Sequence, residues 1–121
     1  MLGQVLAECF KNDFELIAVS RSELDLKNIE EIKPFILRYQ PSIVVNSSAF
    51  IDINKCEQEK DHAFLINSLI VAKMALACND IDAKFVQIST DHYYLDNQTK
   101  KHTEEDAVTL LNTYAYTKFI G

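Results

Sequence analysis

The sequence predicts an α/β fold built on a parallel sheet. Two observations lead to this prediction: short apolar runs alternate with helical patterns along the 121 residues, and the run at residues 42–46 is apolar at three successive positions. An uninterrupted apolar run is typical of a parallel strand covered on both faces, and alternation of strands and helices indicates βαβ units. No internal repeat, low-complexity tract or linker divides the chain, so we expect one structural unit.

Three segments are predicted to be strands, at residues 15–20, 42–46 and 84–89. Each contains β-branched or other large apolar residues, which favour extended structure. In parallel α/β sheets, ligands bind beyond the carboxyl ends of the strands. The residues that follow these three strands are therefore the first candidates for a functional site.

Two helices are predicted between these strands. The first covers residues 29–39, and Asn28 and Glu31 before and within it have the spacing of a capping pair. Pro34 removes a backbone donor after the first turn, so we expect a kink or an early break there. The second helix, at residues 60–79, is predicted to be long and well buried. Its apolar positions are Phe64, Ile66, Leu69, Ile70, Ala72, Met74, Ala75 and Ala77.

The composition excludes several classes of function. A formal net charge of −6 argues against nucleic acid or an anionic membrane as the main partner. No apolar run approaches the roughly 20 residues that a transmembrane helix needs, and the N-terminus lacks the pattern of a signal peptide. We therefore expect a cytoplasmic protein without a nucleic-acid or membrane partner.

The cysteines and histidines predict neither a disulfide framework nor a metal site. The three cysteines are odd in number and widely spaced, without a C-x-x-C pair, which suits a reducing cytoplasm. They are Cys9, Cys56 and Cys78. His62, His92 and His102 lack the spacing of metal ligands, and we expect each to be solvated.

The strongest chemical signal is a tyrosine and a lysine four residues apart, in a helix predicted to begin near Asn112. Tyr114 and Lys118 share one face of that helix. A lysine ammonium close to a phenol favours the phenolate, and a tyrosine so tuned gives or takes a proton at a carbonyl or alcohol oxygen. Taken alone, the same pair also fits an exposed helix face without a catalytic role.

Small polar side chains follow the second and third predicted strands. Thr90 and Asp91 come after the third strand, where the Thr90 hydroxyl can donate to a substrate oxygen. The alternative is a turn that ends the strand. Ser47, Ser48 and Ala49 follow the second strand and either let a cofactor approach the backbone closely or form an ordinary loop.

Ser20 ends the first predicted strand and Arg21 follows it, with Asp25 shortly after them. In dinucleotide-binding folds an acid at this point holds the ribose 2′-hydroxyl, whereas an arginine suits a 2′-phosphate. Ser20 stands in place of the usual acid, which predicts NADP in preference to NAD. Taken alone, Arg21 also fits a solvated surface charge.

Together and in this order, these motifs resemble the extended short-chain dehydrogenase/reductase superfamily and, within it, the dTDP-4-dehydrorhamnose reductase family. The resemblance implies a Rossmann-like, doubly wound parallel sheet. It also implies an oxidoreductase that uses NADP, or NAD, to reduce the 4-keto group of a nucleotide-linked deoxy sugar in dTDP-rhamnose biosynthesis. The matching stretches are residues 1–4, 22–25, 41–46, 89–91 and 112–118.

The resemblance also implies roles for individual residues. Tyr114 is expected to protonate the C4 oxygen, while Lys118 lowers the pKa of the tyrosine and binds the nicotinamide ribose. Thr90 is expected to polarise the keto oxygen, with Asp91 beside the sugar. Asn67 matches a recurrent helix asparagine of the superfamily, and local hydrogen bonding is its alternative. The other cofactor-binding positions are Leu2, Gly3, Ser20, Arg21, Asp25, Leu26, Ser47, Ser48 and Ala49.

The sequence departs from the family at several points. Only Gly3 remains of the glycine-rich loop, and the strand before that loop is missing. His92 replaces a tyrosine, Leu110 replaces a proline, and the chain ends before the sugar-nucleotide domain. We therefore expect residues 1–121 to be a partial NAD(P)-binding Rossmann domain, truncated at both ends, that is inactive alone.

Two other functions remain open. Sugar-nucleotide epimerases and dehydratases are similar, although dehydratases follow the threonine with Asp-Glu, where this chain has Asp91 and His92. A non-catalytic subunit resembling the methionine adenosyltransferase regulatory subunit is the second alternative. Retention of Thr90, Tyr114 and Lys118 favours enzymatic ancestry. A homodimer is an expectation for the full-length form.

Overall fold

The computed structural model describes residues 2–94 and 101–121. The chain folds into two compact units, one formed by Met1–Ser48 with Lys73–Ile88 and the other by Ala49–Ala72 with Ser89–Gly121. The elements, in chain order, are α1 (Leu2–Phe10), α2 (Ile29–Tyr39), β1 (Ile43–Asn46), α3 (Ile53–Gln58), α4 (Lys60–Phe64), the π-helix η1 (Leu65–Leu69), α5 (Ile70–Asn79), β2 (Lys84–Gln87) and α6 (Thr113–Ile120).

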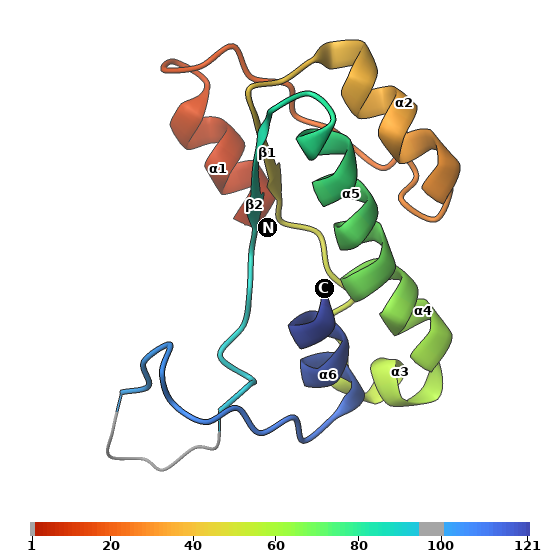
Figure 1. Ribbon diagram of the computed structural model, residues 1–121, viewed down its shortest axis with the longest axis vertical. Helices are drawn as coiled ribbons and strands as arrows, with labels where there is room; N and C mark the ends of the chain where they lie inside the picture. Colours follow the sequence, from red (N-terminus) through yellow and green to blue (C-terminus); the bar gives the residue numbers. More distant parts are fainter. Residues whose placement is uncertain (1, 95–100) are drawn as a thin grey trace. The chain divides into compact units, whose positions relative to one another are not determined.

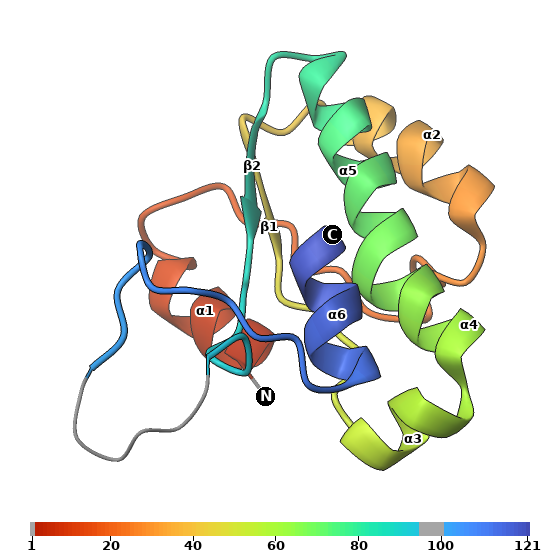
Figure 2. The same cartoon turned by 60° about the horizontal axis from the view of Figure 1, so that its bottom comes forward.

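The first unit has helices on both faces of a parallel strand pair. β1 and β2 pair in parallel with Asn46 opposite Gln87, and the Asn46 side-chain amide donates a hydrogen bond to Gln87 Oε1 at 2.7 Å. Figures 1 and 2 show α1 on one side of the pair, with α2 and the end of α5 on the other. The α/β class and the parallel, Rossmann-like sheet predicted from the sequence are therefore confirmed.

The strand predicted at residues 15–20 is not formed. These residues have no regular secondary structure, and Leu16, Ile17 and Val19 are 42–48% exposed. A strand persists where its backbone hydrogen-bonds to a neighbour, and in the part of the chain that the structure describes the sheet consists of β1 and β2 alone. The apolar pattern indicates a local preference for extended structure, but the described residues provide no partner strand for this segment.

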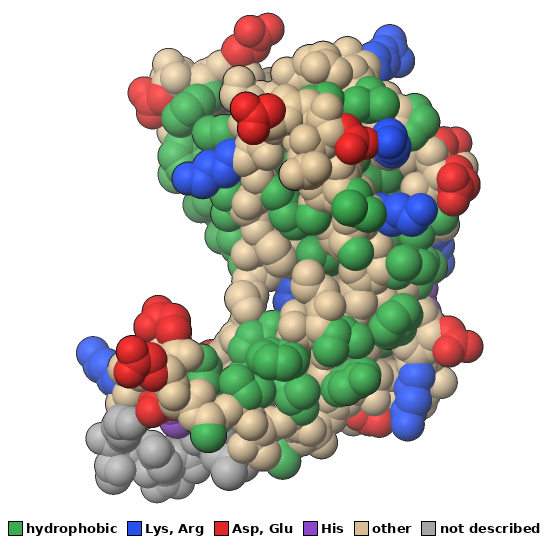
Figure 3. Space-filling view, viewed as in Figure 1, with side chains coloured by type: hydrophobic (Ala, Val, Ile, Leu, Met, Phe, Trp, Pro, Cys, Tyr) green, Lys and Arg blue, Asp and Glu red, His purple; other side chains and the backbone are tan. Residues whose placement is uncertain are grey.

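One face of β1 is open to solvent, so the expectation that both faces are covered is wrong. Val44 is half-buried and Asn46 is buried, whereas Ile43 and Val45 are 46% and 47% exposed. Successive side chains of a strand point to opposite faces, so these two exposed residues mark a single uncovered face. Hydrophobic side chains also reach the surface elsewhere (Figure 3).

α2 begins and ends as predicted, but its cap differs from the prediction. Asn28 makes no side-chain cap hydrogen bond; its Nδ2 donates instead to Glu31 Oε1 at 2.5 Å. The helix continues through Pro34, so the early break, one of the two expected outcomes, is wrong, while the kink stays a prediction. Ile32 and Ile36, buried on either side of the proline along the sequence, share one helix face and stabilise the helix across it.

The helical run at Lys60–Asn79 is continuous, as predicted, and consists of α4, η1 and α5. Its central π-helical turn was not predicted. Ile70 and Met74 are buried, but Phe64 and Leu69 are exposed, so the expected burial of this run is only partly correct. The 3.6-residue period of an α-helix, applied to this sequence, does not distinguish the exposed residues from the buried ones.

The same run is apolar enough, by length and composition, to cross a membrane, with a mean hydropathy of 1.3 over an 18-residue window. The expectation that no apolar run approaches this length is therefore wrong. The core helix of a soluble protein meets the same criterion, and 44% of the window is buried inside the protein. The run is thus weak evidence for a membrane span.

Candidate active site

The second unit contains α6, the helix that carries Tyr114 and Lys118. As predicted, α6 begins next to Asn112, whose Oδ1 accepts a hydrogen bond from the Ala115 backbone N at 2.8 Å. This bond satisfies one of the donors that the first turn of a helix leaves without a partner. The buried residues of α6 are Tyr114, Ala115, Thr117 and Lys118.

Glu57 of α3 binds the same end of α6. Its Oε1 accepts a hydrogen bond from the Thr113 backbone N at 2.6 Å. This bond is the main reason that the pKa of Glu57 lies below its usual value. A carboxylate is favourable at a helix N-terminus, where the backbone dipoles are positive. No sequence signal pairs these residues, because they are 56 positions apart.

Asn67, at the centre of η1, connects α6 to the loop that contains Phe50. Asn67 is 1% exposed, its Oδ1 accepts a hydrogen bond from Phe50 N at 2.8 Å, and its Nδ2 donates to Phe50 O at 3.0 Å. The same Nδ2 donates to Thr117 Oγ1 at 3.1 Å. Local hydrogen bonding, the alternative considered for Asn67, is therefore wrong: the amide is satisfied by residues far away in the sequence.

Two further contacts bring α6 directly against the backbone of η1. Ser68 Oγ donates a hydrogen bond to Thr117 O at 2.6 Å. Gly121 approaches Asn67 so closely that a Cβ atom on it would lie 2.1 Å from the Asn67 carbonyl oxygen. A side chain at this position would therefore force the two elements apart.

The loop at residues 89–94 packs on α6 through two pairs of rings. His92 and Tyr114 lie edge to face with ring centroids 5.5 Å apart, and Tyr93 and Phe119 have the same centroid distance and a similar geometry. Ser89 Oγ also donates a hydrogen bond to Tyr93 OH at 3.1 Å. Burial is the main cause that raises the pKa of Tyr93. His92 is exposed, as expected, and its ring also contacts the tyrosine of the strongest motif.

Thr90 belongs to the same loop and is half-buried, whereas Asp91 is exposed. Thr90 Oγ1 accepts a hydrogen bond from the His92 backbone N at 3.3 Å. His92 therefore contacts Thr90 through its backbone and Tyr114 through its ring. Thr90, Tyr114 and Lys118 all belong to the second unit, and their convergence on one reacting oxygen stays a prediction.

Lys118 is 6% exposed and shares a helix face with Tyr114. Burial lowers the pKa of Lys118, because desolvation disfavours the charged ammonium. Because both side chains lie on one face of α6, an oxygen bound at that face would meet the phenol and the lysine together. This pair can therefore release a proton to an oxygen bound beside it and stabilise the resulting anion.

Most of the predicted cofactor residues belong to the first unit. Gly3 of α1 comes so close to Ser47 that a Cβ on the glycine would lie 2.7 Å from Ser47 Oγ. Only a glycine lets α1 pack this closely on the residues after β1, which is the packing role of the last glycine in dinucleotide-binding loops. The Ser48 backbone N and Oγ both donate to Asn46 Oδ1, at 3.0 and 2.6 Å, so they stabilise the turn itself. Leu2 is exposed, and Ala49 is half-buried in the second unit.

Ser20 is accompanied by a carboxylate that the sequence reasoning missed. Glu23 Oε2 accepts hydrogen bonds from Ser20 N and Ser20 Oγ, both at 2.7 Å. The backbone bond is the main cause that lowers the pKa of Glu23. An acid thus lies beside the serine that stands in place of the usual acid. Arg21 and Asp25 are exposed, and Leu26 is half-buried.

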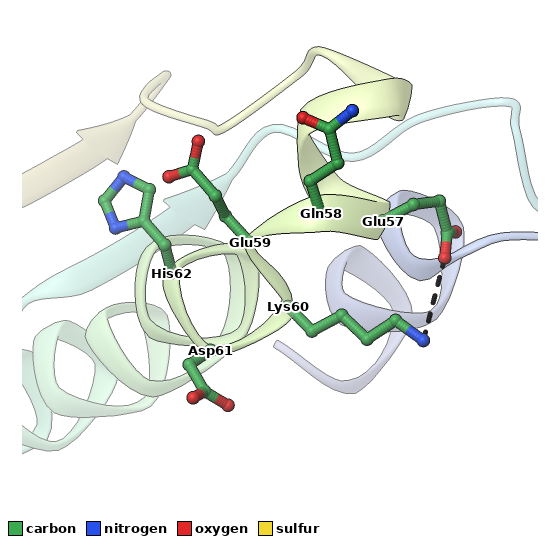
Figure 4. A pocket seen from close by; sticks show the side chains of 6 residues that line it. All are labelled: Glu57, Gln58, Glu59, Lys60, Asp61 and His62. Carbon is green, nitrogen blue, oxygen red and sulfur yellow. Dashed lines mark ion pairs between the residues drawn. The ribbon is translucent and has the colours of Figure 1, made fainter.

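A shallow polar pocket lies elsewhere in the second unit, where α3 meets α4 (Figure 4). It is lined by Glu57, Gln58, Glu59, Lys60, Asp61 and His62. Lys60 Nζ lies 3.8 Å from Glu57 Oε2. None of the predicted site residues lines this pocket. Within residues 2–94 and 101–121, no group of three His, Cys, Asp or Glu side chains is placed to hold a metal ion.

Comparison with known proteins supports the resemblance seen in the motifs. Residues 1–121 match the family described as RmlD substrate binding domain. The chain is 34% identical over 97 residues to dTDP-4-dehydrorhamnose reductase of Escherichia coli, which covers 80% of this chain and 32% of that protein.

Solved structures agree with this match. A dTDP-4-dehydrorhamnose reductase from Clostridium acetobutylicum is 30% identical with a TM-score of 0.91, covering 98% of this chain and 43% of that one. The Bacillus anthracis reductase in complex with NADP is 24% identical with a TM-score of 0.87, covering 97% and 42%, which shows a shared fold. The chain spans less than half the length of these relatives. It belongs to the RmlD substrate binding domain family.

Proposed function

We propose that this chain supplies the catalytic residues of an NADPH-dependent reductase that converts the 4-keto group of a dTDP-linked 6-deoxy sugar to an alcohol. One observation carries the proposal: a buried face of α6 holds Tyr114 and Lys118, and the loop that contains Thr90 packs on that helix through His92. The names of the reductases in E. coli and C. acetobutylicum support the substrate class.

The proposed chemistry divides the reduction between the cofactor and three side chains. NADPH, when bound, supplies the hydride that the carbonyl carbon accepts. Tyr114 donates its phenolic proton to the carbonyl oxygen, which completes the alcohol, and Lys118 stabilises the phenolate that remains. The Thr90 hydroxyl donates a hydrogen bond to the same oxygen and polarises the carbonyl group. Asp91 contacts the sugar.

The proposed cofactor contacts of the first unit are small and charged residues, and those of the second unit are Ala49, Tyr114 and Lys118. Arg21 is exposed and can bind a 2′-phosphate, while the Glu23 carboxylate beside Ser20 can accept a hydrogen bond from a 2′-hydroxyl. We therefore propose that NADPH is preferred and that NADH is also bound. The remaining proposed contacts are Leu2, Gly3, Asp25, Leu26, Ser47 and Ser48. The proposed enzyme is cytoplasmic, has neither a nucleic-acid nor a membrane partner, and forms a homodimer.

The experiment that tests this function is a chimera in which these 121 residues replace the matching segment of the E. coli reductase. We expect the chimera to oxidise NADPH when it is given dTDP-4-dehydrorhamnose. Tyr114→Phe should lower kcat by roughly 10²–10⁴-fold, because the proton donor is lost. Tyr116→Phe is the matched control, since Tyr116 lies on the same helix and is 52% exposed. Equal loss in both variants, or none in either, would contradict the assignment.

Product analysis of the same reaction separates the reductase from its alternatives. A reductase consumes one NADPH for each alcohol formed. An epimerase returns an isomer of the sugar without net consumption of NADPH, a dehydratase releases water, and a binding subunit yields no product. A sugar product without the new hydroxyl group would therefore overturn the proposal.

A further inference from the structure

We propose that Glu57 is a positioning residue for Tyr114: its carboxylate, on α3, fixes the first turn of α6 and thereby the place of the tyrosine. The inference rests on the proposed function, because the rate it affects is that of the same reduction. It adds a residue that no sequence motif connects with Tyr114.

The hydrogen bonds at the start of α6 lie on both sides of the tyrosine. Glu57 Oε1 accepts from the backbone N of Thr113, the residue before Tyr114, at 2.6 Å. Asn112 Oδ1 accepts from the backbone N of Ala115, the residue after it, at 2.8 Å. The backbone of Tyr114 is thus held on either side by side-chain oxygens, one of which comes from another helix.

α3 also contacts the tyrosine through packing. Cys56, the neighbour of Glu57, is fully buried in a cluster with Ala63 and Tyr114, and Phe50 packs against that cluster. The ring of Tyr114 and the backbone before it are therefore both held by successive residues of α3. Of Cys56 and Glu57, only Glu57 is polar and exposed. Its side chain can therefore be changed without opening a cavity.

The pocket at the end of α3 provides a matched control. In Figure 4, the Glu57 side chain reaches toward α6, and that of Glu59 lies on the other side of the pocket, away from α6. Both residues are exposed acids within the same pocket. The charged groups around Glu57 are Lys60, at 3.8 Å, and the other acids that line the pocket. Removal of Glu59 thus changes the local charge as much as removal of Glu57, without removing the bond to Thr113.

Positioning matters here because proton transfer depends on the place of the phenol oxygen. A misplacement of about 1 Å caused by a distant change can lower a rate about 10²-fold. Loss of a single anchor that has a second anchor beside it should cost less. We expect Glu57→Ala to lower kcat of the chimera about tenfold with little change in KM, and Glu57→Gln, which keeps an acceptor oxygen, to restore most of the rate. Glu59→Ala should leave kcat unchanged.

A second readout uses the 121-residue chain itself and needs no activity. The Thr113 amide proton should shift with pH as the Glu57 carboxylate titrates below its usual range, and this titration should vanish in Glu57→Gln but persist in Glu59→Ala. A Thr113 amide that titrates equally in all three proteins, or a chimera whose kcat is the same in Glu57→Ala and Glu59→Ala, would overturn the positioning role. If the chimera reduces no ketone while the titration behaves as expected, the proposed function fails and the contact stands.

Discussion

The region around α6 and the segment at residues 15–20 differ in what holds them in place. Side chains from α3 and η1 hydrogen-bond to α6, chiefly Glu57, Asn67 and Ser68. Residues 15–20 are apolar at most positions, yet every one is exposed and none is in a helix or strand. Apolar character alone therefore does not place a segment in a helix or strand, whereas side-chain partners on α3 and η1 fix α6 against these elements.

The largest expected effect concerns the buried side-chain amide of Asn67, which hydrogen-bonds to α6. Asn67→Leu removes the acceptor of Phe50 N and one of the two hydrogen bonds at Phe50 O and at Thr117 Oγ1, and should lower the free energy of unfolding by about 2–4 kcal/mol. Urea unfolding measures this change. Asn54→Leu, at an exposed position of α3, is the control and should stay within about 0.5 kcal/mol. Equal losses of stability in Asn67→Leu and Asn54→Leu would contradict the claim that specific side-chain partners hold α6 in place.

A second variant separates stability from activity on α6. Lys118→Met should remove a pH dependence of the free energy of unfolding, because the pKa of Lys118 is lowered by burial and its charged form is disfavoured in the folded state. The unfolded chain then binds more protons between the lowered pKa and 10.5, so the stability of the parent rises with pH in that window.

The free energy of unfolding of the parent should therefore rise relative to that of Lys118→Met as pH rises from the lowered pKa toward 10.5. Thermal unfolding over a series of pH values measures it, and the same variant in the chimera should lose ketone reduction. A stability difference between the two proteins that stays constant over this pH window contradicts the account of a buried ammonium whose pKa is lowered.

The smallest expected effect concerns the open face of β1. Val45 is 47% exposed, so Val45→Thr should change the free energy of unfolding by less than about 0.5 kcal/mol. Ile32→Val, at a fully buried site of α2, should cost about 0.5–1.5 kcal/mol and serves as the comparison. The denaturant midpoints of the two variants measure both changes. A larger loss of stability in Val45→Thr than in Ile32→Val would mean that this face of β1 is covered.

Sequence patterns predicted the elements whose stabilising contacts are local or repeat regularly. The bounds of α2, the start of α6 next to Asn112 and the parallel pairing of β1 with β2 follow from periodicity, capping and apolar runs. The strand expected at residues 15–20 fails because strand formation depends on a neighbour that no local pattern describes. The π-helical turn of η1 was not predicted for a related reason, because the hydrophobic period does not distinguish it from an α-helix.

The candidate site shows the same division. Tyr114 and Lys118 are recognised from their spacing, because a helix places residues four apart on one face. The hydrogen bonds that hold that helix could not be predicted, since Glu57 and Asn67 bond to positions about 50 residues away and Asn67 was noted only through the family resemblance. The sequence marks His92 only as a departure from the family pattern. Its contact with Tyr114 depends on how the chain folds.

Hydrogen exchange of individual amides tests the central claim most directly, because it reports on both regions in one experiment. After correction for intrinsic rates, the amides of Thr117 and Lys118 should exchange more slowly than those of Leu16 and Ile17, on the order of 10²-fold or more. That result would show that the polar contacts from α3 and η1 hold the helix of the candidate site while the apolar segment stays open. Equal protection in the two regions would contradict the account.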